Sequence, residues 1–241
     1  MTSNKRSSNK VIALSQDLLY RKKTGEPAGE IVSALAQLAE EDLKQALKTD
    51  DEKKAFWINL YNGFTQVKLQ ADPGQYKNRS SFFKKRDIEV AGMHFSLDDI
   101  EHGILRRSRI KWSLGYLGKL FPSGTEKALR VDRLDYRIHF ALNCGAKSCP
   151  PIAYYSDELL QSQLDLATRA YLKNESGYDP VKQTVRLPRL MSWFRADFGG
   201  KKGIKNILRQ QGIVPAGINP VIKFNRYDWT LSTGNYTDLD S

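Results

Sequence analysis

The sequence predicts one α+β domain in which a helical N-terminal half surrounds a small sheet. Its 241 residues are enough for one large core and few for two domains. Apolar residues recur at helical spacing through much of the first half, whereas short runs at 87–95, 184–187 and 221–231 are typical of strands. We therefore assign residues 11–241 to a single globular domain and residues 1–10, rich in Ser, Asn and Lys, to a disordered tail.

Three helices are expected before the first strand, at 11–23, about 29–48 and about 52–71. The third is apolar around most of its circumference, so it should lie at the centre of the core. Asn59 and Asn62 are part of a narrow amide stripe on this helix. Because buried amides need partners, they either bond the backbone of an adjoining loop or orient a catalytic group.

A hairpin and a capped helix are expected next. Residues 87–95 form the hairpin, and Ser96 caps the helix, with Asp99 completing a variant of the capping box. Residues 123–135, further along, are polar and expected to be a loop.

Glu101 lies within the inward-facing apolar stripe of the capped helix, and His102 lies at the edge of that stripe. An inward carboxylate must be paired or protonated. Glu101 therefore either forms a core salt bridge with Arg106 or Arg137, or it orients His139 or a bound group.

Residues 136–143 are predicted to form a buried strand, with His139 and Asn143 on the same face, and residues 144–151 the loop that leaves it. The expected later elements are a helix from Ser156 to about Asn174, a strand at 184–187, short helices at 193–198 and 203–211, and a closing strand at 221–231.

The loop carries the two cysteines of the chain, Cys144 and Cys149. Two cysteines are too few for a disulfide scaffold, and the polar N-terminus does not indicate secretion. We therefore expect thiols in a reducing, cytoplasmic compartment, unless the two serve as a redox pair.

Cys149 is the preferred nucleophile, because a nearby imidazolium or helix N-terminus lowers the pKa of a thiol. His139 would be the base, with Glu101 or Asn143 as the orienting group. Alternatively both cysteines are small buried hydrophobes, or they bind zinc together with His139 and His102. Phosphate-loop, dinucleotide-binding and His-Glu-x-x-His patterns are absent, and we expect no cofactor.

The chain is basic, since 38 lysine and arginine residues against 27 acidic ones give a net charge of +11. Such a charge favours anionic partners, but the basic residues are spread over several short blocks. No stretch is apolar for the roughly 18 to 20 residues that a spanning helix needs. The sequence does not indicate the oligomeric state.

Three long motifs resemble the domain of unknown function 547 family. They are AFWINLYN at 55–62, FSLDDIEHGILR at 95–106 and RIHFALNCGAKSCPP at 137–151, and YDWTL at 227–231 is similar to the end of that family. The resemblance covers about residues 55–231. It implies a bacterial or plant protein of unassigned activity. The motif content also suggests a distant likeness to papain or transglutaminase-type thiol enzymes, from which no catalytic position transfers.

The leading hypothesis is a thiol-dependent hydrolase or acyl transferase acting on an amide or ester. In it Cys149 attacks, with Cys144 beside it in the same loop, and His139 moves the proton with support from Glu101 or His102. Substrate binding falls to the polar residues placed among apolar ones, Asn59, Asn62 and Arg106, and Asn59 or Asn62 helps hold the oxyanion. The alternative is a non-catalytic module that binds an anionic or protein partner through its basic surface.

Overall fold

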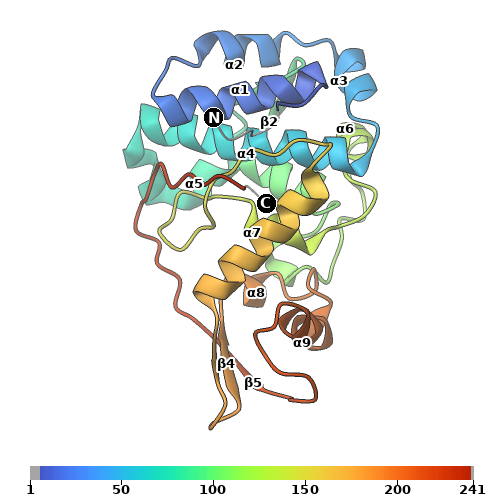
Figure 1. Cartoon of the computed structure of the whole chain (residues 1–241). Coiled ribbons are helices and arrows are strands. Elements are labelled where there is room, and N and C mark those ends of the chain that lie inside the picture. Colours follow the sequence, from blue (N-terminus) through green and yellow to red (C-terminus); the bar gives the residue numbers. More distant parts are fainter. Residues whose placement is uncertain (1–5, 240–241) are drawn as a thin grey trace.

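The computed structural model describes residues 6–239, which fold as a single α+β domain. A layer of helices forms one end of the molecule and a small sheet covered by helices forms the other, with one long helix running between them (Figure 1). The α-helices are α1 (Lys10–Thr24), α2 (Gly29–Ala36), α3 (Glu40–Ala46), α4 (Asp50–Ala71), α5 (Arg79–Lys84), α6 (Gly124–Leu129), α7 (Leu160–Glu175), α8 (Leu190–Trp193) and α9 (Gly200–Gln210). Short 3₁₀-helices are η1 (Pro73–Asn78), η3 (Lys111–Ser113) and η4 (Tyr136–Phe140), and η2 (Asp99–Leu105) is a π-helix. The strands are β1 (Ile88–Val90), β2 (Met93–Phe95), β3 (Gly177–Asp179), β4 (Thr184–Leu187) and β5 (Val221–Phe224).

The first helix matches the expected range, but the tail before it is shorter than expected. Asn9 caps α1 by accepting hydrogen bonds from the first backbone amides of the helix. Ser7 is buried, and its backbone and hydroxyl bond Gln16 and Asp157. The expectation of disorder is therefore wrong for residues 6–10, and residues 1–5 lie outside the described part.

The single helix expected at about 29–48 is wrong, because the segment forms α2 and α3. The carbonyls of Leu35 and Ala36, at the end of α2, accept hydrogen bonds from Ala91 and Gly92 in the β1–β2 turn, each at 2.9 Å. These carbonyls are thus satisfied outside a helix, so the chain can turn here.

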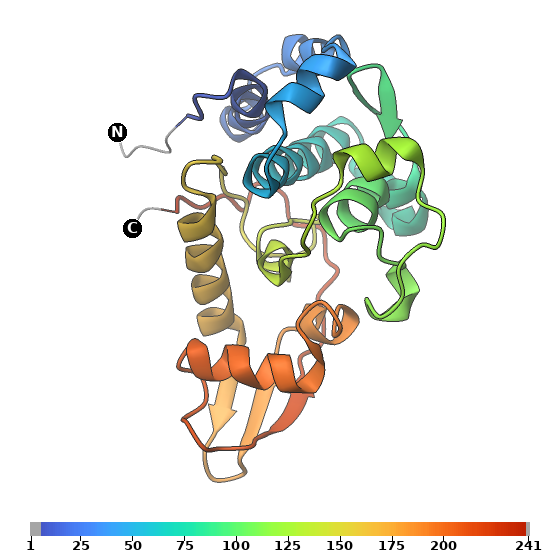
Figure 2. The same cartoon turned by 90° about the vertical axis from the view of Figure 1, so that its right-hand side faces the viewer.

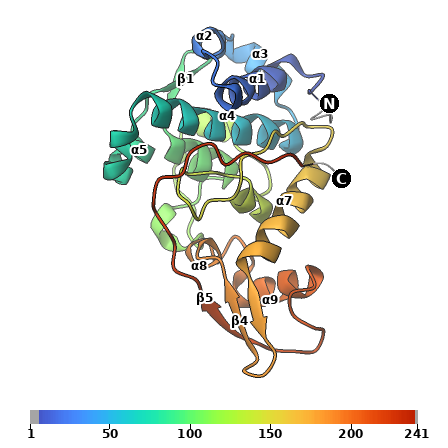
Figure 3. The same cartoon turned by 60° about the vertical axis from the view of Figure 1, so that its left-hand side comes forward.

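Helix α4 is the centre of the helical layer, as its apolar circumference predicts. Thr49 and Glu52 form a capping box at its start, and Trp57 and Tyr61 are among its fully buried side chains. Helix α1 lies alongside it (Figures 1 and 3). A Cβ atom at Gly63 would come within 2.7 Å of the Leu18 side chain, so the two helices approach closely there.

The hairpin and the cap that follows it are confirmed. Strands β1 and β2 pair antiparallel, and the Ser96 hydroxyl accepts from the Asp99 amide at 3.0 Å while the Asp99 carboxylate accepts from the Ser96 amide at 3.0 Å. The capped helix is the π-helix η2. The segment 123–135, expected to be a loop, contains α6.

The strand predicted at 136–143 is wrong, because residues 136–140 form the 3₁₀-helix η4. Asp135 caps it by accepting from the Arg137 amide at 3.0 Å, and the Asn143 amide donates to the side chain of Asn62. These backbone amides therefore bond nearby or side-chain acceptors instead of the backbone of a neighbouring strand. A short apolar run does not by itself distinguish a buried strand from a buried helix.

The second sheet and its covering helix form the other end of the molecule. Strand β4 pairs antiparallel with β3 and parallel with β5, and α9 lies across one face (Figure 2). The predicted strand at 184–187 is confirmed. The helix expected from Ser156 begins at Leu160, and α9 begins three residues before the helix expected at 203–211. The helix expected at 193–198 is wrong, because α8 ends at Trp193 and turns follow it.

The closing strand ends at Phe224, and the chain then returns along the helical layer (Figure 3). Backbone hydrogen bonds hold this return segment to the cysteine loop, from the Lys147 amide to Thr230 at 2.8 Å and from the Ser232 amide to Gly145 at 2.8 Å. The return segment thus brings the residues around 227–229 beside the two cysteines.

Candidate active site

The two cysteines are joined by a disulfide in the loop that follows η4. The expectation of free thiols is therefore wrong for this state of the protein. The structure instead fits the alternative that the sequence left open, in which the two cysteines are a redox pair. Asn143 braces the loop by donating to the Pro150 carbonyl at 2.7 Å and accepting from the Gly145 amide at 2.9 Å.

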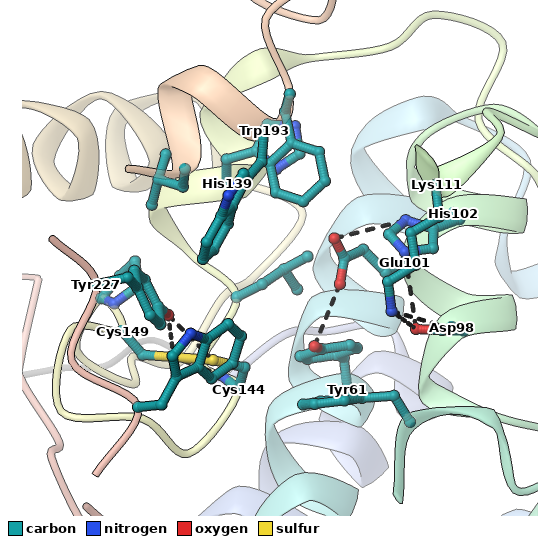
Figure 4. Close-up of a pocket in the computed structure, with 16 residues that line it drawn as sticks. Tyr61, Asp98, Glu101, His102, Lys111, His139, Cys144, Cys149, Trp193 and Tyr227 are labelled. Carbon is teal, nitrogen blue, oxygen red and sulfur yellow. Dashed lines mark hydrogen bonds and ion pairs between the residues drawn. A yellow bond between two sulfur atoms is a disulfide. The ribbon is translucent and has the colours of Figure 1, made fainter. Parts of the chain in front are cut away.

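A cavity of about 110 Å³ lies between this disulfide and helix η2 (Figure 4). The cysteines form part of one wall, and Glu101 and His102 form part of the opposite wall, with His139 also in the lining. The full lining comprises Tyr61, Phe83, Asp98, Glu101, His102, Lys111, His139, Leu142, Cys144, Cys149, Pro150, Leu190, Trp193, Phe194, Tyr227 and Trp229.

The sulfur wall is covered by aromatic side chains from two later segments. The Tyr227 hydroxyl lies 3.1 Å from the Cys149 sulfur and 3.2 Å from the Cys144 sulfur. Trp193 and Trp229 pack on Tyr227, with ring centroids 4.8 and 4.6 Å from it. Cys149 is only 4% exposed, and it forms part of the cavity lining.

His139 is held by a carboxylate that the sequence did not predict. Its Nε2 lies 2.8 Å from Oδ2 of Asp197, and its ring stacks on Phe194 with centroids 4.1 Å apart. Burial lowers the pKa of His139, and the hydrogen bond to Asp197 opposes that effect. An ionised carboxylate only accepts, so the neutral ring carries its proton on Nε2 and keeps a lone pair on Nδ1.

Arg106 is fully buried and bonds the same carboxylate. Its Nε and one terminal nitrogen lie 2.6 and 3.2 Å from the Asp197 oxygens. Burial alone would raise the pKa of Asp197, but the hydrogen bonds from His139 and Arg106 outweigh it and lower that pKa. Arg106 does not line the cavity, so the geometry gives it a positioning role instead of the expected substrate contact.

Glu101 forms neither of the salt bridges that the sequence suggested. Arg106 pairs with Asp197, and Arg137 pairs with Asp135 and Asp165. Glu101 instead accepts a hydrogen bond from the Tyr61 hydroxyl at 3.2 Å. Burial raises the pKa of Glu101 to about 7, which makes this carboxyl a proton donor or acceptor near neutral pH.

His102 lies between Glu101 and Arg106. Its Nδ1 is 3.5 Å from Glu101 Oε1 and accepts from Arg106 at 3.0 Å, and its Nε2 is 3.7 Å from Asp98. Burial, together with the positive charges of Arg106 and Lys111, holds the pKa of His102 well below its usual value. His102 is therefore a neutral side chain at the cavity wall.

The amides of α4 bond backbone groups. Asn59 donates to the Tyr155 carbonyl at 2.8 Å and accepts from the Tyr155 amide at 3.0 Å. Asn62 donates to the Ala141 carbonyl at 2.9 Å and accepts from the Asn143 amide at 2.8 Å. Of the alternatives for this stripe, the geometry fits the one in which the amides bond an adjoining loop, and neither side chain lines the cavity.

Sequence reasoning missed Asp197 and did not use Tyr227 as a site residue. Asp197 stands alone after a short helix, and no local pattern links it to His139, 58 residues earlier. Tyr227 was part of a motif that carried the family resemblance, which was the available signal.

Within residues 6–239, no group of three or more His, Cys, Asp or Glu side chains is placed to hold a metal ion, and the disulfide engages both sulfurs of the suggested zinc set. None of the helices in this same part of the chain has the length and apolar character needed to cross a bilayer.

Comparison with known proteins assigns a family without an activity. The family model described as "Protein of unknown function, DUF547" matches residues 45–172, more than half of the chain. No curated protein and no solved structure gives a significant match, so the likeness to papain or transglutaminase-type enzymes is not shown. The match extends from the end of α3 through α4, η2 and the cysteine loop into α7, and it includes Glu101, His139 and both cysteines. The chain therefore belongs to the DUF547 family.

Proposed function

We propose that the protein is a thiol-dependent hydrolase or acyl transferase that acts on an ester or amide. One observation carries the proposal: the Cys149 sulfur lines the same cavity as His139, whose Nε2 is fixed by Asp197 at 2.8 Å. A nucleophile, a base and a carboxylate that orients the base are the parts that acyl transfer through a covalent intermediate needs.

The tautomer of His139 determines its role in the reaction. Because Asp197 keeps the proton of the neutral ring on Nε2, Nδ1 is the atom that accepts a proton from the Cys149 thiol. The thiolate then attacks the carbonyl carbon of the substrate, and the imidazolium passes the proton to the leaving amine or alcohol. Water, or an acceptor nucleophile in a transferase, cleaves the resulting thioester and regenerates the thiol.

The disulfide makes this chemistry dependent on reduction. A cellular dithiol supplies two electrons and two protons, is itself oxidised to a disulfide, and leaves Cys144 and Cys149 as thiols. The oxidised protein has no free nucleophile. We therefore place the active form in a reducing compartment such as the cytoplasm.

Glu101 is the second acid–base group of the site, after His139. Burial raises the pKa of Glu101 to about 7, so a large fraction is protonated near neutral pH and can donate to the oxyanion of the tetrahedral intermediate. This role replaces the one expected for Asn59 and Asn62, whose amide groups are engaged with backbone.

The test is the pre-steady-state cleavage of p-nitrophenyl acetate, an activated ester, by the reduced full-length protein. We expect a burst of nitrophenolate close to one equivalent and an acetyl group on Cys149 by mass spectrometry. Cys149→Ser abolishes both. Cys144→Ser, which cannot form the disulfide, retains the burst and no longer needs the reductant.

A second measurement tests the activation of the thiol. Iodoacetamide alkylates the reduced, folded protein over a series of pH values, and we expect Cys149 to react well below pH 8 because His139 lies in the same cavity. Alkylation only above about pH 8, or only after unfolding, would remove the basis for a nucleophile.

A further inference from the structure

Residues 112–121 carry an unusual concentration of exposed apolar side chains. Among the described residues, ten large apolar side chains are exposed, and six of them belong to this short segment. Phe121 is 92% exposed, Leu120 87% and Trp112 76%, and Leu114, Tyr116 and Leu117 are the other three. Exposed apolar groups clustered in this way mark a surface that meets another apolar phase.

The backbone that carries these side chains is held by hydrogen bonds. The Ile110 amide donates to the Leu117 carbonyl at 2.9 Å, and the Lys119 amide donates to the Ser108 carbonyl at 2.7 Å. At the tip, the Leu114 carbonyl accepts from the Ala196 amide at 3.0 Å. The segment lies at the edge of the molecule opposite both chain ends (Figure 2). Trp112, Leu114 and Leu117 are therefore presented from a fixed turn, and Leu120 and Phe121 follow directly after the last of these bonds.

The same segment is uniformly basic. Residues 107–121 contain Arg107, Arg109, Lys111 and Lys119 and no acidic residue. Lys111 pairs with Asp98 and Lys119 with Glu126, whereas Arg107 and Arg109 form no ion pair with any residue between 6 and 239. Two cationic side chains thus stand next to the apolar cluster without a counter-ion from the protein.

We propose that residues 107–121 form a docking segment for an anionic lipid bilayer. Leu120, Phe121 and Trp112 enter the interfacial region, and Arg107 and Arg109 meet the lipid phosphates. Leu, Phe and Trp beside arginine are the combination that interfacial anchors use, since apolar burial and attraction to anionic lipid add together. The absence of acidic residues within the segment favours an anionic surface over a protein partner of mixed charge. The proposal is independent of the chemistry of Cys149.

The test measures binding of the full chain to vesicles by sedimentation. We expect binding to vesicles of phosphatidylcholine mixed with phosphatidylglycerol, and little binding to pure phosphatidylcholine. Leu120→Ser combined with Phe121→Ser should weaken binding by about tenfold or more, and Arg107→Gln combined with Arg109→Gln by about fivefold per arginine. A blue shift of tryptophan emission on binding should be smaller in Trp112→Phe.

Controls come from exposed residues outside the segment. Val181 is 91% exposed and Val221 59% exposed, both outside the segment, so Val181→Ser with Val221→Ser removes exposed apolar surface elsewhere. Lys201→Gln with Lys202→Gln removes two charges elsewhere. We expect both control pairs to bind as the unchanged protein does.

Three results would overturn the proposal. They are no binding to anionic vesicles at low salt, unchanged binding in the Leu120→Ser, Phe121→Ser variant, and an oligomer that the same variant converts to a monomer. The last result would identify a second copy of the chain as the occupant of this surface. The circular dichroism of each variant verifies that it is folded.

Discussion

The Nε2–H of His139 donates to Oδ2 of Asp197 across 2.8 Å, and the same oxygen accepts from Nε of Arg106 at 2.6 Å. One carboxylate thus fixes the imidazole and neutralises a fully buried guanidinium. Because burying an unpaired charge is costly, the position of Arg106 constrains Asp197, and Asp197 in turn constrains the His139 ring, which lines the same cavity as the cysteines. Arg106 is in this sense a positioning residue for His139.

Asp197→Asn should separate the positioning role from a purely structural one. The amide can donate to Nε2 and so favours the tautomer with its proton on Nδ1, which removes the base. We expect the nitrophenolate burst rate to fall by about 10²- to 10⁴-fold and the alkylation profile of Cys149 to shift to higher pH. Stopped-flow absorbance and alkylation across pH measure these effects.

Asp165→Asn is the matched control for this change. Asp165 also pairs with an arginine, Arg137, but its side chain is mostly exposed and lies away from the cavity lining. It should leave the burst and the alkylation profile unchanged. Equal losses in the two variants would contradict the role of Asp197, and so would an Asp197→Asn protein that is merely less stable.

Glu101→Gln should change how stability depends on pH. Burial raises the folded-state pKa of Glu101 from 4.5 to about 7, so the folded protein holds this proton more tightly than the unfolded chain. The stabilisation is present below pH 4.5 and is lost as pH rises toward 7. Between pH 4.5 and about 7, we expect the free energy of unfolding of the unchanged protein to fall by about 3 kcal/mol relative to that of Glu101→Gln.

Urea unfolding at several pH values between about 4.5 and 8 measures this difference. Comparison with the variant separates the contribution of Glu101 from those of His102 and His139, which are present in both proteins. The lowered pKa values of these histidines make stability rise with pH instead. Glu89→Gln, on the exposed side of β1, is the control and should run parallel to the unchanged protein. Parallel curves for Glu101→Gln as well would show that Glu101 does not titrate in this range.

The sequence predicted the parts of the fold that local patterns determine. The apolar circumference of α4, the Ser96 and Asp99 cap and the hairpin before it are confirmed, since each depends on residues within a few positions. The strand predicted at 136–143 was wrong in part because the Ala141 carbonyl and the Asn143 amide bond Asn62, a side chain about eighty positions away. No local pattern contains such a partner.

The candidate site was predicted only in part, because some of its residues are distant from one another in sequence. His139, Glu101, His102 and both cysteines line one cavity, as polar residues set in apolar runs suggested. Asp197 was missed because it comes from a separate helical turn. The disulfide was left only as an alternative to free thiols, because the geometry of the loop decides whether two sulfurs meet.

Asn62→Ala should destabilise the fold considerably more than Gln70→Ala, a change at an exposed position of the same helix. The Asn62 side chain satisfies the Ala141 carbonyl and the Asn143 amide, both buried, and alanine leaves each without a partner. We expect a loss of about 3 kcal/mol in the free energy of unfolding for Asn62→Ala, against about 0.5 kcal/mol or less for Gln70→Ala. Urea unfolding compares them, and similar losses would argue against a bracing role.

Reduction of the Cys144–Cys149 disulfide should lower stability only modestly and leave the fold intact. The bond closes a loop across a sequence separation of 5, so the chain entropy that it removes from the unfolded state corresponds to about 2 kcal/mol. Asn143 continues to bridge the same loop to the Pro150 carbonyl after reduction. We therefore expect the urea midpoint to fall on adding a dithiol reductant while the circular dichroism of the folded state is unchanged. The Cys144→Ser, Cys149→Ser double variant has no bond to lose, so its midpoint should not respond to the reductant. Unfolding of the native protein on reduction would mean that the bond is needed to hold the fold, and a thiol enzyme active in its reduced form would then be untenable.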